Sequence, residues 1–179
     1  MIEFKPEITF TSTNNFVLKH KMFYKLWIIL VVLSKKRLFN KINFIFTDDA
    51  TILDINRKHL QHDYLTDIIT FDYTEEFNKS EIDITQYEKF FQSTYNFVPT
   101  IKKKIKRLEA VQVVSGDIYI SVPTVKDNAK RLNINFYDEL HRVMVHGVLH
   151  LCGQGDKTEI EQKQMRKLEN IYINYLKTL

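Results

Sequence analysis

The chain has 179 residues, of which 44% are hydrophobic and 27% are charged, and its formal net charge is +4. This composition excludes wholesale disorder, and the length suits a single domain, residues 1–179, with a core of its own. The positive charge permits a polyanionic partner but does not require one. Because Cys152 is the one cysteine, no internal disulfide can form, and we expect a reducing compartment such as the cytoplasm.

The first part of the chain predicts a strand, a helix and a second strand. Residues 8–11 look like a short strand, and residues 15–36 predict a helix with Thr13 or Asn14 as its N-cap. The most apolar run, Leu26–Leu33, is too short to cross a membrane, which takes about 20 apolar residues. It also begins late for a signal peptide, and no small-residue cleavage site follows it. We therefore expect a buried core helix here and no membrane partner.

The middle of the chain predicts the rest of a sheet. Ile42–Thr47 alternates and forms the second strand, and Asp48-Asp49 then begins a short helix. Residues 67–73 and 116–122 predict a third and a fourth strand. The segment between them, about residues 75–114, is acidic, then aromatic, then basic, and we interpret it as an insertion rather than a second domain. Its basic end could contact phosphates or could be a solvated surface helix.

The last part of the chain is predicted to be helical. Pro123 begins a helix that runs to about Leu132, and Tyr137–Cys152 forms a longer, central helix. Thr158 and Glu161 form a capping box for a final helix. One apolar stripe would dock that helix on the core: Met165, Leu168, Ile171, Tyr172, Tyr175 and Leu179. Four strands and about five helices, without regular alternation, predict an α+β fold with a mixed four-stranded sheet.

The strongest functional signal lies at the end of the central helix. His146 and His150 are four residues apart, so their rings share one helix face, one turn from each other. The other residues from Val143 to Cys152 are apolar or glycine, which indicates a buried helix. A buried imidazole needs a hydrogen-bond partner or a metal ion. A pair of histidines at this spacing is most often accidental, but the apolar setting favours a metal site at the end of this helix.

Asp156 completes a candidate ligand set. Gly153 and Gly155 give the backbone the freedom to end the helix and turn, which would bring Asp156 back towards the two rings. Two imidazoles and a carboxylate are typical zinc ligands, and they leave a position for water or substrate. A zinc ion held in this way lowers the pKa of bound water to roughly 7, which suits a hydrolase.

Gly147 argues against a metallopeptidase, and three further histidines are not expected to bind the metal. The commonest metallopeptidase motif has Glu directly after the first His as the general base, and here that position is Gly147. A metallopeptidase would therefore lack its proton acceptor. His141 lies on another side of the helix and is predicted to be structural. His59 and His62 could meet a substrate, but surface or capping roles are the simpler interpretation.

Four segments of the chain together resemble one known family. They are His146-Gly-Val-Leu-His150-Leu-Cys-Gly153, Phe46-Thr-Asp-Asp49, Asp63-Tyr-Leu-Thr66-Asp67-Ile-Ile-Thr70-Phe71 and Gly116-Asp117-Ile-Tyr-Ile-Ser121. The combination resembles the YbeY endoribonucleases, the bacterial rRNA maturation factors, over nearly the whole chain apart from the insertion. The resemblance implies an α+β fold with a four-stranded sheet and one zinc ion per chain, with His146 and His150 as ligands. It also implies a single-strand-specific endoribonuclease that processes 16S rRNA, with the small ribosomal subunit as partner.

The sequence departs from the family's pattern at two positions. The commonest motif has a third His where Asp156 stands, and a carboxylate ligand shifts the metal preference towards harder ions. Many members carry an Arg where this chain has Leu60, which leaves the stabilisation of charge on a phosphate unassigned. Asp67 and Asp117 are further candidates for orienting the ligands, although both could simply satisfy strand ends. A non-catalytic small-subunit assembly factor with a structural metal, and a metallopeptidase, remain as alternatives.

Overall fold

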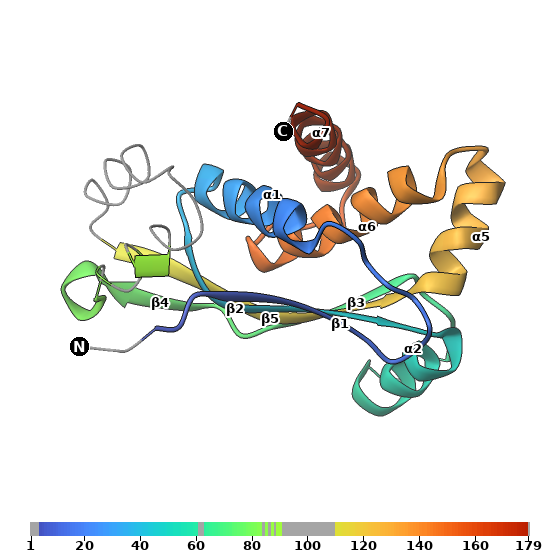
Figure 1. The fold of residues 1–179 in the computed structure, drawn as a ribbon, viewed down its shortest axis with the longest axis horizontal. Coiled ribbons are helices and arrows are strands. Elements are labelled where there is room, and N and C mark those ends of the chain that lie inside the picture. Colours follow the sequence, from blue (N-terminus) through green and yellow to red (C-terminus); the bar gives the residue numbers. More distant parts are fainter. Residues whose placement is uncertain are drawn as a thin grey trace.

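The computed structural model describes residues 4–60, 63–83, 85, 87, 89–90 and 110–178. In this part of the chain a five-stranded mixed sheet carries helices on one face, which confirms the α+β class (Figure 1). The strands are β1 (Glu7–Ser12), β2 (Leu38–Thr47), β3 (Ile68–Asp72), β4 (Glu75–Asn78) and β5 (Ala110–Ser121). β1, β2 and β5 are parallel neighbours, and β3 and β4 pair one after the other, antiparallel, with the far edge of β5. The sheet thus has one strand more than the sequence predicts.

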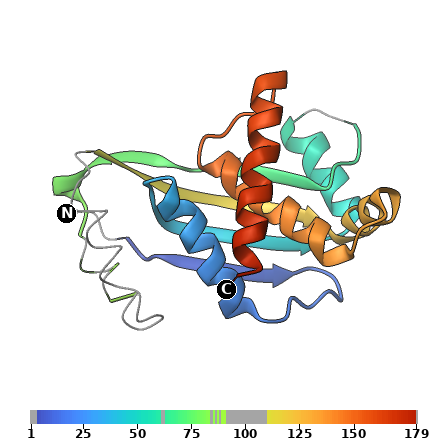
Figure 2. The ribbon, with the colours of Figure 1, turned by 90° about the horizontal axis from the view of Figure 1, so that it is seen from above.

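Three helices make the layers above the sheet. α1 (Lys21–Ser34) and α6 (Phe136–Leu151) lie directly on one sheet face, and α7 (Glu159–Leu176) crosses over them (Figure 2). α2 (Asp49–Ile55), the π-helical turn η1 (Asn56–Leu60) and α5 (Val122–Leu132) lie towards one end of the sheet. The core fills the space between the sheet and the first helix layer. No described helix is long and apolar enough to span a bilayer.

Strand alternation decides which side chains meet the helices. Ile118 and Ile120 of β5 are fully buried, as the pattern predicts. Asp117, which alternates with them, accepts a hydrogen bond of 2.6 Å from Asn43 on the neighbouring strand. Asn43 in turn accepts one from Thr9. Asp117 therefore belongs to a polar ladder on the sheet face away from α6.

The first helix begins later than the sequence predicts. Residues 15–20 precede it, and α1 starts at Lys21 after His20, whose φ of 54° lies in the left-handed region. A residue with that φ cannot continue a right-handed helix, so the predicted start near residue 15 and its cap at Thr13 or Asn14 are wrong. The apolar run itself is buried as expected, with Trp27, Ile28 and Val31 at 0% exposure.

Part of the expected insertion belongs to the sheet. β4 and the first residues of β5 lie within residues 75–114, so β5 begins at Ala110 and not at Gly116. Tyr87 is buried and donates its hydroxyl hydrogen to the backbone oxygen of Phe39, 2.8 Å away. The basic run at residues 102–107 lies outside the described residues.

The final helix carries the predicted capping box and a different buried stripe. Thr158 and Glu161 exchange hydrogen bonds with each other's backbone, as expected. The buried positions are Met165, Glu169, Ile173 and Leu176. Ile171 and Tyr175 of the predicted stripe are exposed, and Leu179 lies beyond the described residues. The prediction from apolar residues alone places the buried face of α7 incorrectly, because one of the buried positions is the carboxylate Glu169.

Candidate metal centre

The end of α6 is a Schellman motif that turns the chain back over the helix. Cys152 is the C-cap, and Gly153 follows it with a φ of 74°, a conformation that favours glycine. The amides of Gly153 and Gln154 donate to the carbonyls of His150 and Leu149, at 2.7 and 2.9 Å. This turn places Asp156 against the face of α6 that carries the two histidines.

Gly155 lies close to the capping box of α7 and has no unusual φ. A Cβ at this position would stand 2.5 Å from Oε1 of Glu161, the capping-box carboxylate of α7. The loop between α6 and α7 is therefore packed tightly against the start of α7. This packing limits where the next residue, Asp156, can lie.

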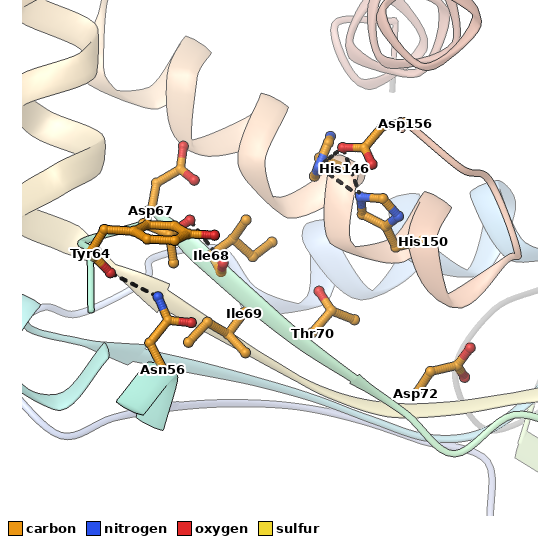
Figure 3. Close-up of a pocket in the computed structure, with 11 residues that line it drawn as sticks. Asn56, Tyr64, Asp67, Ile68, Ile69, Thr70, Asp72, His146, His150 and Asp156 are labelled. Atoms are coloured by element: carbon orange, nitrogen blue, oxygen red, sulfur yellow. Dashed lines mark hydrogen bonds and ion pairs between the residues drawn. The ribbon is translucent and has the colours of Figure 1, made fainter. Parts of the chain in front are cut away.

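His146, His150 and Asp156 converge on one point, and we call these three residues the ligand cluster (Figure 3). The two Nε2 atoms are 2.9 Å apart, and Oδ2 of Asp156 lies 3.7 Å from the first and 3.5 Å from the second. Ligand atoms about 2.0–2.1 Å from a tetrahedral zinc ion stand about 3.3 Å from one another. The three observed separations bracket that value, so the group could hold a metal ion.

Glu169 orients His146 from behind. Its Oε1 lies 2.9 Å from Nδ1 of His146, and its side chain is only 4% exposed. An ionised carboxylate can only accept, so Nδ1 carries the proton and Nε2 turns its lone pair towards the cluster. Carboxylates commonly fix the tautomer of a metal-binding histidine in this way.

Two arginines hold Glu169 in its charged form. Oε2 of Glu169 accepts hydrogen bonds from Arg142 at 3.0 Å and from Arg166 at 3.1 Å. Burial alone would raise the pKa of Glu169, but the hydrogen bonds from His146 and Arg142 and the charge of Arg166 together lower it. The carboxylate therefore stays ionised beside the imidazole.

His150 is held neutral, the form in which imidazole binds metals. Burial lowers its pKa, and the neighbouring ring of His146 lowers it further. The Asp156 charge and a hydrogen bond with the backbone of Gln154 act in the opposite direction without reversing the shift. A neutral ring at the cluster leaves its Nε2 able to donate a lone pair to an ion.

The cluster forms one wall of an open cleft of about 680 Å³, which we call the β3-side cleft. Its lining residues are Asn56, Tyr64, Thr66, Asp67, Ile68, Ile69, Thr70, Asp72, His146, His150 and Asp156. Thr70 rises from β3 below His150 (Figure 3). Its Oγ1 is buried without a hydrogen-bond partner among the described residues. An orphaned hydroxyl beside a converging donor set fits a site built for a further ligand.

The other predicted site residues separate into two groups. Asp67 lines the β3-side cleft and accepts a hydrogen bond of 3.1 Å from Asn128, so the structure brings it near the cluster. Asp117 lies on the far face of the sheet, and the structure does not bring it there. His141 points into the core, where its Nε2 is 3.0 Å from the hydroxyl of Tyr24. His59 stacks edge-on against Phe71, and His62 is not among the described residues.

Gly147 occupies the position at which a metallopeptidase would carry its general base. A Cβ there would lie 2.8 Å from Ile68 and 2.9 Å from Ile118, because this face of α6 is pressed onto the sheet. A glutamate could not fit, and its carboxylate would point into the core rather than the cleft. The geometry therefore argues against the peptidase alternative more strongly than the missing residue alone.

Comparisons with known proteins agree on one family. The family model described as Endoribonuclease YbeY matches residues 11–177. The Endoribonuclease YbeY of Christiangramia forsetii is 37% identical over 165 residues, covering 92% of this chain and 91% of that protein. The Endoribonuclease YbeY of Karelsulcia muelleri is 34% identical over 170 residues, covering 95% and 96%.

A solved structure shares the fold at lower identity. The solution structure of TM1509 from Thermotoga maritima has a TM-score of 0.56 and 20% identity, covering 95% of this chain and 89% of that one. The family match spans most of the chain, and the curated relatives match nearly end to end. The chain therefore belongs to the YbeY endoribonuclease family.

Proposed function

We propose that this protein is a metal-dependent, single-strand-specific endoribonuclease that acts in the maturation of 16S rRNA on the small ribosomal subunit, in the cytoplasm. His146, His150 and Asp156 would hold one zinc ion. The observation that carries the proposal is the convergence of two imidazole Nε2 atoms and one carboxylate oxygen on the wall of an open cleft. The names of the curated relatives supply the RNA substrate.

Each residue of the cluster has a distinct task in this mechanism. When bound, the ion would supply Lewis acidity towards a phosphate and towards water. His146 and His150 present their Nε2 atoms from consecutive turns of one helix, and Asp156 adds a carboxylate oxygen. Glu169 keeps the proton of His146 on Nδ1, away from the cleft. The ligand cluster is open to substrate on the side that faces the β3-side cleft.

The rim of the cleft suits an unpaired base. Tyr64 lines the cleft, and 58% of its surface is exposed; the adjacent Leu65 is 51% exposed. An exposed aromatic ring can stack on a base only when that base is free of a duplex, and such stacking is worth about 1–3 kcal/mol. Tyr64 in the same cleft as the cluster thus supports a preference for single strands.

The second candidate function is a non-catalytic assembly factor with a structural metal. It is favoured by the charge of the β3-side cleft, whose lining includes Asp67 and Asp72 but no lysine or arginine. A cleft of this charge offers a phosphate no compensation beyond the ion itself. Cleavage assays separate the two functions.

The test is cleavage of a single-stranded RNA by the purified protein and by Asp156→Ala. We expect the wild type to cut the single strand and to spare the same sequence in a duplex. Loss of one ligand should lower the rate at least 100-fold, while Asp127→Ala, an exposed carboxylate on α5, should leave it unchanged. Absence of cleavage by the wild type, together with a metal-dependent melting temperature, would favour the assembly factor instead.

A further inference from the structure

A second cavity meets the ligand cluster from the opposite side. It has a volume of about 610 Å³, and we call it the α7-side cavity. Its lining residues are His146, Asp156, Glu159, Gln162, Lys163, Met165, Arg166 and Glu169. It shares His146 and Asp156 with the β3-side cleft, so the cluster lies between two open spaces. An extended strand that passed over the cluster would enter both.

The two spaces differ in charge. The β3-side cleft has no basic side chain among its lining residues, whereas the α7-side cavity has Lys163 and Arg166. These two residues are three positions apart on α7 and therefore share one helix face. Both are exposed. The same lining also holds the carboxylates of Asp156, Glu159 and Glu169, so the α7 side differs from the β3 side by its two cationic donors and not by a net positive charge.

Glu169 ties Arg166 to the metal ligand. One of its oxygens accepts from Nδ1 of His146, and the other accepts from Nη1 of Arg166 at 3.1 Å. Arg166 is therefore held beside the cluster, although its side chain is 63% exposed. A guanidinium has five N–H donors in a flat fork, so this one bond leaves others for a ligand.

Arg142 is a second arginine that contacts Glu169, so Glu169 and Arg166 do not form an isolated ion pair. It donates to Glu169 at 3.0 Å and to Asn170 at 3.1 Å, and its side chain is only 24% exposed. Arg142 thus compensates the buried charge of Glu169 from the inner side. Arg166 shares in this compensation, and its other N–H donors remain for the cavity that it lines, where Glu159, in the first turn of α7, is the remaining carboxylate outside the cluster network.

We propose that Arg166 and Lys163 form a subsite for an RNA phosphate next to the one received by the metal centre. A single strand would then cross the site with a base against Tyr64 on the β3 side and its backbone against α7. Planar guanidinium and ammonium donors on an exposed helix face are a suitable match for a phosphodiester. This subsite rests on the proposed function, since it takes RNA as the ligand.

The test is the salt dependence of RNA binding. Because the proposed function has the loaded protein cut RNA, the probe is a labelled single-stranded oligonucleotide with 2′-O-methyl riboses. It is titrated with the metal-loaded protein at several KCl concentrations by fluorescence anisotropy, and a gel checks that the probe stays intact. Each lost phosphate contact should reduce the slope of log Kd against log[KCl] by about 0.7. Because Lys163 and Arg166 share one phosphate, the Lys163→Gln/Arg166→Gln variant should lose about 0.7 of slope and bind several-fold more weakly at low salt.

A matched variant separates a subsite from a change of net charge. Lys130→Gln/Lys167→Gln removes the same two charges from exposed positions that line neither space. It should keep the wild-type slope. Because Arg166 also contacts Glu169, all proteins are compared at saturating zinc, with elemental analysis showing that each carries its metal, so that a weaker metal site does not enter the slope. Equal slopes for the two variants would overturn the subsite.

The binding test of the subsite and the cleavage test of the proposed function can fail separately. If the wild type cleaves RNA but the slope of the Lys163/Arg166 variant is unchanged, the subsite is wrong and the proposed function stands. If the slope falls but the wild type cuts no RNA, the subsite stands and the endoribonuclease proposal fails.

Discussion

Among single residues, Glu169 has the largest consequence for the metal centre. It is one of the few buried charged side chains described, and it accepts hydrogen bonds from His146, Arg142 and Arg166 at once. The loss of such a partner typically lowers the metal affinity of a histidine site by 10–100-fold. Sequence reasoning missed it, because it lies far beyond the ligand motif and within an apparently amphipathic helix.

We predict that Glu169→Gln weakens zinc binding about 10–100-fold. The amide retains the shape of the side chain but loses the charge that holds the proton on Nδ1 of His146. Competition with a chelator measures the dissociation constant, and imidazole ¹⁵N shifts report the tautomer. Glu159→Gln, on the exposed first turn of the same helix, should match the wild type. Unchanged affinity in Glu169→Gln would remove its orienting role.

Also at the residue scale, the structure shows which arginines lie near the ligand cluster. The family resemblance places the arginine that many members carry at Leu60, the last residue of η1. Arg142 and Arg166 instead reach Glu169 from α6 and α7. A single sequence does not show that α6 and α7 will cross at these residues. The position of the two arginines beside Glu169 could therefore be found only from the structure.

Among the elements, α6 depends on its close approach to the sheet. Gly147 permits that approach, since any Cβ would press on Ile68 and Ile118. The same helix carries both histidines, so a shift of α6 would move them relative to Asp156. The glycine thus links core packing to the geometry of the site.

We predict that Gly147→Ala destabilises the protein by about 1–3 kcal/mol, despite the better helix propensity of alanine. The contact at 2.8 Å is with Cδ1 of Ile68. Adding Ile68→Val removes that atom and should recover part of the loss. Urea unfolding of the single and double variants measures both effects. Additive losses would show that the pressure on Ile68 is not the cause.

The sequence predicts the convergence of His146, His150 and Asp156 better than it predicts the elements around them. The histidine spacing, the Gly153 turn and the capping box could all be read locally, because each depends on residues within one or two turns. The start of α1 could not, since the left-handed φ of His20 is set by the chain leading into the helix. β4 and the early part of β5 were hidden because their pairing is long-range.

On the scale of the whole molecule, a half-buried histidine resists protonation in the folded state. Burial lowers the pKa of His141 to about 4, and the charge of Asp138 offsets only part of this. The ring packs among Tyr24, Trp27 and Tyr137. The folded protein therefore resists taking up a proton that the unfolded chain accepts near pH 6.5.

We predict that stability falls as the pH drops from about 6.5 towards 4, since the unfolded state binds the proton first. The folded-state pKa of His141 lies below its unfolded value, so this loss appears on the acid side and is absent above pH 7. Melting temperatures across this range measure it. His141→Gln should be less stable at pH 7 but should show a flatter decline, whereas His20→Gln, at an exposed position, should keep the wild-type decline. Parallel curves for all three proteins would exclude His141 as the source.

The most direct test of the account is a zinc titration of metal-stripped protein, followed by its cleavage of single-stranded RNA. The ligand cluster predicts that activity is absent without metal and rises to a plateau at about one zinc ion per chain. Asp156→Ala should bind zinc far more weakly and reach no plateau at that ratio. Cleavage that persists after the metal is removed, or full zinc retention by Asp156→Ala, would contradict a catalytic metal held by His146, His150 and Asp156.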